Sequence, residues 1–174
     1  NHALLLRAFS VVAVPLNNDM MVLTGGEGPA EQHVRDQIAG MGLSGRVRRT
    51  GLIPRRDVLA IVRGAVAMTW PSRYEGFGLP ILEAMSLDTP VLSSDAGALP
   101  EVAGGAAHLL PVDDPDAWLE GMRQMLEDGE ERQRMIEAGH ARVTGFTWRH
   151  TADCILDAYR RAAKNLPSDE ETVP

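Results

Sequence analysis

The sequence predicts an α/β fold in which a parallel sheet is flanked by helices, a Rossmann-like arrangement. Short apolar segments, each long enough for one buried strand, alternate along the chain with longer segments of helical periodicity. The 174 residues are 44% hydrophobic and 24% charged, which suits one globular domain with a substantial core. A sheet of this kind binds ligands beyond the carboxyl ends of its strands, where loops lead into helix N-termini.

The first half of the chain begins with a helix over 3–14, predicted from apolar residues at helical spacing, and no strand pattern precedes it. A short buried strand over 20–24 follows, and then a helix over 29–41 that begins at a proline and stops before a glycine. The next predicted elements are a strand over 46–50, a helix over 54–63 and a strand over 65–70.

In the second half, a glycine-containing loop leads into a helix over 79–86. Acidic side chains at 113–116 could cap a helix over 116–127, whose apolar stripe of Trp118, Met122 and Met125 we expect in the core. The other predicted elements are a strand over 90–94, a helical turn over 99–102, a strand over 108–110 and helices over 130–138 and 148–164.

We interpret residues 1–166 as one domain and residues 167–174, which lack an apolar pattern, as a disordered tail. The net charge of −7 argues against nucleic-acid binding through the overall field of the protein. No apolar run reaches the ~18 residues of a membrane span, and no signal peptide is visible. The single cysteine, Cys154, fits a reducing compartment and is expected to be buried on the apolar side of the last helix.

The segment 75–83 is the most informative because it places a carboxylate on each side of a glycine-rich turn. Gly76 and Gly78 permit close approach of a ligand and a positive φ, and Pro80 suits the first turn of the following helix. The N–H groups of Gly78 and Leu79 would then be free at the helix N-terminus, where an anion such as a diphosphate binds.

The two carboxylates would lie on opposite sides of these amides. Glu83 follows Leu79 by one helical turn, roughly 6 Å along the axis, and its side chain leans back toward the N-terminus, whereas Glu75 precedes the amides. This order matches the sugar, diphosphate and ribose of a nucleotide sugar, whose paired hydroxyls a carboxylate can bind. The pattern alone leaves a second interpretation open, a glycine-rich turn with two solvated glutamates at a helix start.

The segment 71–85 resembles the signature of retaining glycosyltransferases of the two-domain GT-B fold, group 1 (family four). The similarity extends from about Asn1 to Arg161 and includes the segments 5–9, 24–29, 51–54, 90–92, 99–102 and 146–148. It implies that the chain is the C-terminal, nucleotide-sugar-binding half of such a fold. Three parts of the family fold would then lie outside the sequence. They are the first strand of this domain, the Arg and Lys residues that usually neutralise the leaving diphosphate, and the N-terminal acceptor domain.

The resemblance also implies roles for individual residues. Glu75 would contact the donor sugar as the catalytic candidate, Glu83 would hold the ribose, and backbone amides between them would contact the diphosphate. The loop after Gly51 would lie against the nucleobase. The residues themselves suggest that Gly26 belongs to a strand-to-helix turn lining the nucleotide pocket, in preference to a phosphate loop, because the segment lacks the Lys and Ser/Thr of a P-loop. The implied donor-binding residues are Glu75, Gly76, Phe77, Gly78, Leu79, Glu83, Leu52, Ile53 and Gly26.

The resulting prediction is the donor-binding half of an enzyme that moves a hexosyl group from a nucleoside diphosphate sugar, GDP-mannose or a UDP-hexose. The acceptor, a glycan or lipid-linked glycan of surface polysaccharide or glycan synthesis, would bind through the missing domain, so this chain alone is expected to be inactive. No cofactor or metal is implied, and the full-length protein would be cytoplasmic or peripheral at the inner membrane face. The alternatives are a related GT-B sugar-nucleotide epimerase or phosphorylase, and a non-catalytic nucleotide-binding module.

A few residues depart from the family pattern or have competing interpretations. Asp88 stands where many members have glycine, and we expect it to tolerate the left-handed backbone of a turn. Arg55 and Arg56 are interpreted as a solvated helix start in preference to nucleotide contacts, and Arg73 as a weaker candidate for a phosphate contact. The acidic run at 113–116 superficially resembles a metal-binding triplet, but helix capping explains it better.

Overall fold

The computed structural model describes residues 1–12 and 19–164, and the chain divides into two compact units, Asn1–Val143 and a second unit that begins at Thr144. The predicted end of the first helix at residue 14 and the predicted tail at 167–174 lie outside the described residues. In chain order the elements are α1 (His2–Val12), β1 (Met21–Thr24), α2 (Glu31–Gly40), β2 (Val47–Gly51), α3 (Arg55–Arg63), β3 (Met68–Trp70), α4 (Leu79–Met85), β4 (Val91–Ser94), α5 (Leu99–Ala103), β5 (His108–Leu110), α6 (Pro115–Glu127), α7 (Gly129–Val143) and α8 (Trp148–Lys164).

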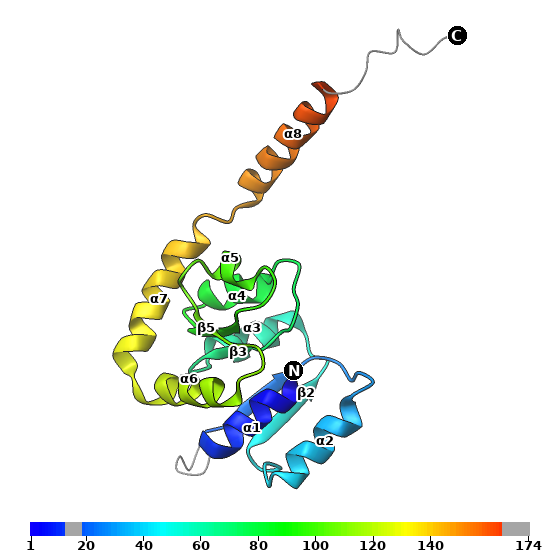
Figure 1. Cartoon of the computed structure of the whole chain (residues 1–174), viewed down its shortest axis with the longest axis vertical. Helices are drawn as coiled ribbons and strands as arrows, with labels where there is room; N and C mark the ends of the chain where they lie inside the picture. The colour runs from blue at the N-terminus through cyan, green and yellow to red at the C-terminus, as the bar shows by residue number, and fades with distance from the viewer. Residues whose placement is uncertain (13–18, 165–174) are drawn as a thin grey trace, which may run out of the picture. The chain divides into compact units, whose positions relative to one another are not determined.

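The strands of the first unit form two parallel sheets connected by helices, which confirms the predicted α/β class (Figure 1). One sheet pairs β1 with β2, and the other has the order β3-β4-β5. All pairs are parallel, with Thr69 opposite Leu92 and Ser93 opposite Leu109. Every residue of the central strand β4 is buried, as expected for a parallel strand covered on both faces.

The core of the first unit lies largely between α1 and α6, which pack side by side (Figure 1). On α1 the buried face includes Leu6 and Phe9, and on α6 it includes Trp118, Met122 and Met125. Trp118 is completely buried and its indole N–H donates to the Pro111 carbonyl at 2.9 Å. The predicted assignment of the α6 stripe to the core is therefore confirmed.

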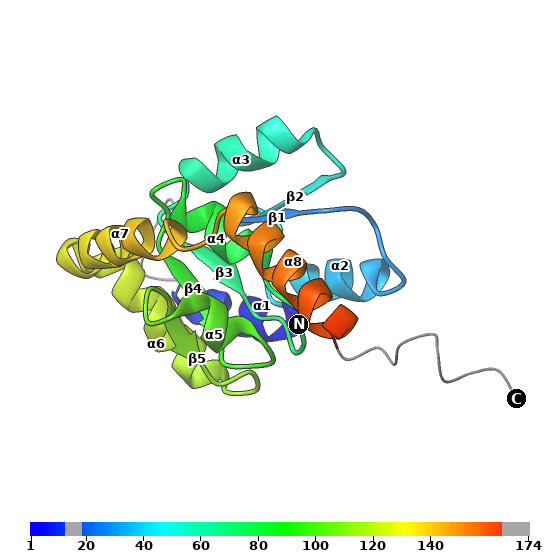
Figure 2. The same ribbon diagram turned by 90° about the horizontal axis from the view of Figure 1, so that it is seen from above.

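Two local predictions about turns and caps are also confirmed. Asp114 is the N-cap of α6, and its Oδ1 accepts hydrogen bonds from the Asp116 and Ala117 amides at 3.0 and 3.1 Å. Asp88 has a φ of +60° in the turn after α4, in the left-handed region predicted for it, and its carboxylate contacts the His140 ring on α7. That contact ties the turn to α7, which packs against α4 (Figure 2).

The second unit contains α8, whose residues 148–163 are all exposed. The prediction that Cys154 is buried is therefore wrong, because its thiol lies on the surface of this helix. Helical periodicity identifies an apolar face, but burial requires another element to cover that face. Among the described residues, no helix has the length and apolar character that crossing a membrane requires.

Candidate functional site

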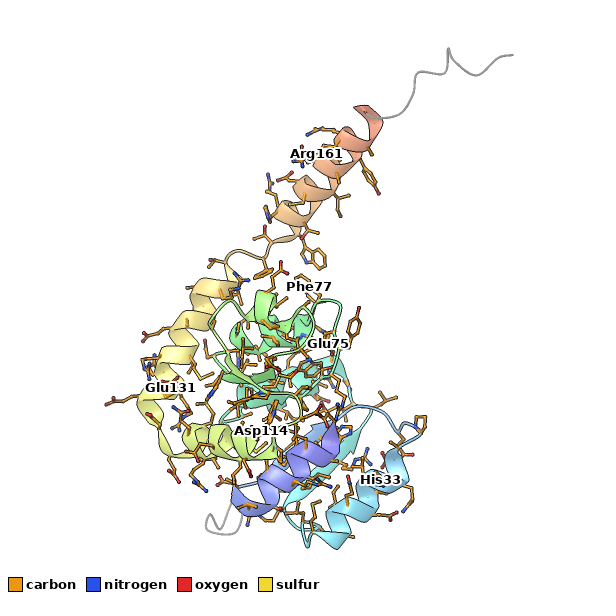
Figure 3. All side chains as sticks on the ribbon, viewed as in Figure 1. His33, Glu75, Phe77, Asp114, Glu131 and Arg161 are labelled. Carbon is orange, nitrogen blue, oxygen red and sulfur yellow. The ribbon has the colours of Figure 1, made fainter. Side chains whose placement is uncertain are left out.

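The loop between β3 and α4 carries the predicted two-carboxylate segment and ends at Gly78, the N-cap of α4 (Figure 3). Gly78 has a φ of +98°, a backbone conformation that favours glycine. A Cβ atom at this position would also lie 2.6 Å from Leu99 Cδ2, so the buried Leu99 side chain on α5 would have to move. The backbone conformation of this turn therefore favours glycine, and the close packing against Leu99 favours it further.

The N-terminus of α4 has the free amides that the sequence predicts. No side chain caps it, and Pro80 occupies its first turn without an N–H group. The Ile81 N–H donates to the Gly78 carbonyl at 3.0 Å, whereas the N–H groups of Gly78 and Leu79 make no hydrogen bond among the described residues. An anion at this end of α4 would therefore meet unpaired donors.

Glu75 is positioned by the turn that precedes α5. The Ala98 N–H donates to the Glu75 carbonyl at 3.4 Å, and a Cβ atom on Gly97 would lie 3.0 Å from the same oxygen. The Glu75 residue is half-buried, and its carboxylate makes no hydrogen bond or ion pair within the described part of the chain. This leaves both carboxylate oxygens available to a ligand beside the loop.

Glu83 lies one turn into α4, and its carboxylate is paired with Arg55, the first residue of α3. The distance between Arg55 Nη2 and Glu83 Oε1 is 2.7 Å. From the sequence, Arg55 is expected to be part of a solvated helix start. The side chain is indeed 71% exposed, but it forms an ion pair with a predicted site residue. No sequence signal could have identified this pair, because 28 residues separate its members and only the packing of α3 against α4 brings them together.

The loops after β1 and β2 contact each other at the carboxyl ends of their strands. A Cβ atom on Gly26 would lie 3.2 Å from Leu52 Cγ, and the Gly25 N–H donates to the Gly51 carbonyl at 3.3 Å. Leu52 is 87% exposed as a residue, although its side chain lies against Gly26. The structure therefore brings Gly26 and Leu52 together at the carboxyl ends of β1 and β2.

The structure joins these predicted residues into two neighbouring groups. Glu75, Gly76, Phe77, Gly78, Leu79 and Glu83 share the loop and first turns of α4, and Gly26 and Leu52 share the β1–β2 loops. Ile53 follows Leu52 directly, and Arg55, two residues further on, contacts Glu83. The chain from Leu52 to Arg55 thus leads from one group to the other.

Arg73, the weaker candidate for a phosphate contact, is paired with a carboxylate in this structure. Its Nη1 donates to Asp113 Oδ2 at 3.0 Å, beside a cavity of about 180 Å³ that Asn1 and Arg7 also line. Within the described residues, no three His, Cys, Asp or Glu side chains gather as metal ligands would. In the structure, Asp113 forms an ion pair with Arg73, and Asp114 caps α6.

Residues 1–142 match the model of the family described as glycosyl transferases group 1. The chain is 32% identical over 157 residues to O-antigen chain mannosyltransferase B of Escherichia coli, an alignment covering 90% of this chain and 41% of that protein.

Solved structures share the fold. Sucrose-phosphate synthase from Thermosynechococcus elongatus superposes with a TM-score of 0.80 at 23% identity, covering 95% of this chain and 44% of that one. HepE from Anabaena, solved in complex with UDP and glucose, superposes with a TM-score of 0.78 at 20% identity, covering 92% and 44%. The chain therefore spans less than half the length of these proteins.

Proposed function

Because the chain belongs to the group 1 family of glycosyl transferases, we propose that it is the donor-binding half of a retaining hexosyltransferase. The observation that carries the proposal is the placement of two carboxylates, Glu75 and Glu83, around the uncapped N-terminus of α4. A nucleotide sugar has hydroxyl pairs at both ends and an anionic diphosphate between them. The site offers the matching groups in the matching order.

In this proposal each part of the site binds one part of the donor. The amides of Phe77, Gly78 and Leu79 face the diphosphate, and Glu83 accepts hydrogen bonds from the ribose hydroxyls. Glu75 accepts hydrogen bonds from the sugar hydroxyls and so fixes the anomeric carbon relative to the diphosphate. Charged acceptors strengthen such hydrogen bonds, which favours both carboxylates as ligands for hydroxyl groups.

The chemistry follows from the placement of these groups. The bond between the anomeric carbon and the diphosphate oxygen breaks, and the electron pair leaves with the diphosphate. Amide dipoles aimed at that oxygen lower the barrier because the negative charge develops where they already point. The hydroxyl oxygen of the acceptor forms the new bond to the anomeric carbon, and its proton passes to the departing diphosphate. The residues that hold the acceptor, and the further cationic groups that we expect near the diphosphate, would lie outside this chain.

The nucleoside and sugar remain open between GDP-mannose and a UDP-hexose. The mannosyltransferase relative supports the first donor, and the neighbouring structure with UDP and glucose supports the second. The mannosyltransferase also supports a role in surface polysaccharide or glycan synthesis, which we place in the cytoplasm or at the inner membrane face. The acceptor would be a glycan or a lipid-linked glycan.

Calorimetric titration of the chain with GDP, UDP, GDP-mannose and UDP-glucose tests the proposal, with Glu75→Gln as the informative variant. We expect weak binding of one nucleoside diphosphate and its sugar by the wild type. The variant should lose affinity for the nucleotide sugar but bind the free diphosphate normally, since Glu75 lies on the sugar side of the amides. Absence of binding to all four ligands, or equal losses for diphosphate and nucleotide sugar, would contradict the proposal.

A further inference from the structure

The ion pair between Arg55 and Glu83 joins a residue of no proposed function to the proposed ribose carboxylate. The guanidinium contacts Oε1 alone, and Oε2 accepts no hydrogen bond among the described residues. The Glu83 side chain is 35% exposed, so a ligand can reach it. A carboxylate oxygen accepts more than one hydrogen bond, which leaves room for a vicinal diol beside the arginine.

The negative charge of Glu83 would disfavour binding of a diphosphate nearby, and the positive charge of Arg55 can reduce this effect. The carboxylate stands one helical turn from amides that would hold a diphosphate, and two anions at such a separation repel each other. A guanidinium paired with that carboxylate offsets its charge without occupying its second oxygen. The pair also restricts the side-chain rotation of Glu83, which reduces the ordering required when a ligand binds.

We infer that Arg55 is a positioning residue of the donor site. It orients the Glu83 carboxylate toward the ribose and reduces the repulsion between that carboxylate and the diphosphate. The inference rests on the proposed function and adds a residue that acts through Glu83. Arg55 belongs to α3 and Glu83 to α4, so the pair also fixes the loop carrying Leu52 and Ile53 relative to the rest of the site.

Arg56 provides a matched control one residue away. It carries the same charge at the same helix start, but its Nε lies 3.4 Å from Asp57 and its side chain is 86% exposed. A general effect of positive charge near the N-terminus of α3 would therefore be similar for the two arginines. An effect transmitted through Glu83 would be confined to Arg55.

The test is calorimetry with the preferred nucleoside diphosphate on the wild type, Arg55→Gln, Arg55→Lys, Arg56→Gln, Glu83→Gln and the double variant of Arg55→Gln with Glu83→Gln. We expect Arg55→Gln to weaken binding about 3- to 5-fold, the upper part of the scale for a partly exposed charge interaction. Arg55→Lys should restore most of the affinity, and Arg56→Gln should stay within about 2-fold of the wild type. In the Glu83→Gln background, loss of Arg55 should change the affinity less than about 2-fold, because the group through which it acts is already altered.

The outcomes separate this inference from the proposed function. If the wild type binds but Arg55→Gln and Arg56→Gln behave alike, the inference fails and the proposed function stands. Equal effects of Arg55→Gln in both backgrounds would also overturn the inference, since Arg55 would then act without Glu83. If the wild type binds no nucleoside diphosphate, both fail, and thermal unfolding of each variant shows whether loss of folding contributes.

Discussion

At Gly97 the size of one residue controls the position of the loop that carries Glu75. A Cβ atom there would lie 3.0 Å from the Glu75 carbonyl oxygen and 3.2 Å from its nitrogen, and the φ of +58° is itself unfavourable for alanine. We predict that Gly97→Ala lowers the free energy of unfolding by about 1–2 kcal/mol through its backbone conformation. The variant should also weaken nucleotide-sugar binding by displacing Glu75, as measured by calorimetry.

Gly105 supplies the control for this prediction. Its φ is +84°, but no atom lies within 4 Å of a Cβ built there. Gly105→Ala should therefore have the conformational cost of Gly97→Ala without its effect on ligand affinity. Similar ligand affinities for the two variants would show that the contact between Gly97 and Glu75 does not position the site.

The Glu83 carboxylate gives the second prediction at this scale. Glu83→Gln keeps the shape of the side chain but removes its charge, so hydrogen bonds from a ribose become weaker. We predict a loss of roughly 1.5–3 kcal/mol in nucleoside diphosphate binding, the range for hydrogen bonds to charged groups. Unchanged affinity for both GDP and UDP would refute the assignment of Glu83 to the ribose.

Features that depend on a residue and its immediate neighbours, such as helix caps and turn conformations, were predictable from the sequence. Contacts between residues far apart in the chain were not. The cap at Asp114 and the positive φ at Asp88 follow from the chemistry of those side chains and their immediate neighbours. The pairing of Arg55 with Glu83 depends on how two helices pack, and the contact of Gly97 with Glu75 depends on two turns meeting. Neither arrangement leaves a signal in sequence spacing.

At the scale of elements, the N-cap of α6 stabilises a helix that contributes a large part of the core. Asp114 satisfies the first two free amides of this helix, and Trp118 follows one turn later in the core. We predict that Asp114→Ala lowers the free energy of unfolding by about 1 kcal/mol, measured by urea denaturation.

Asp113 is the natural comparison for that variant. Its carboxylate forms an exposed ion pair with Arg73, 62% exposed on both sides, and caps no helix. Asp113→Ala should therefore cost less than Asp114→Ala, within about 0–1 kcal/mol. A larger loss at Asp113 would show that the Arg73 pair, and not the cap, stabilises this region.

The order of helices and strands was predictable because each element has its own apolar periodicity and its own start and stop residues. The burial of α8 could not be predicted in the same way. Cys154 was expected to be buried but is exposed, and this shows the reason. Its apolar positions, including Ile155, Leu156 and Tyr159, are exposed in the described structure. Periodicity reports which face of a helix is apolar, while coverage of that face depends on the rest of the molecule.

At the scale of the whole molecule, the chain spans 41% of the Escherichia coli mannosyltransferase to which it is similar. In our proposal the acceptor binds residues outside this chain, so we predict nucleotide binding without sugar transfer. The loss of even one electrostatic contact to a transition state costs about 10²–10³ in rate. An assay with GDP-mannose and UDP-glucose that follows both hydrolysis and transfer checks this, and sustained turnover would mean that the 174 residues hold the complete catalytic machinery.

The central claim is that a nucleoside diphosphate lies across the N-terminus of α4, between the β1–β2 loops and Glu75. Amide chemical-shift mapping by NMR, with the isotope-labelled chain titrated with GDP or UDP, tests it most directly. We predict that the largest shifts fall on residues 76–79, with further shifts at Gly26, Leu52 and Ile53. The amides of α6, which lie outside the proposed site, should remain unchanged. Saturable shifts confined to other surfaces, or none in segment 76–79, would contradict the account.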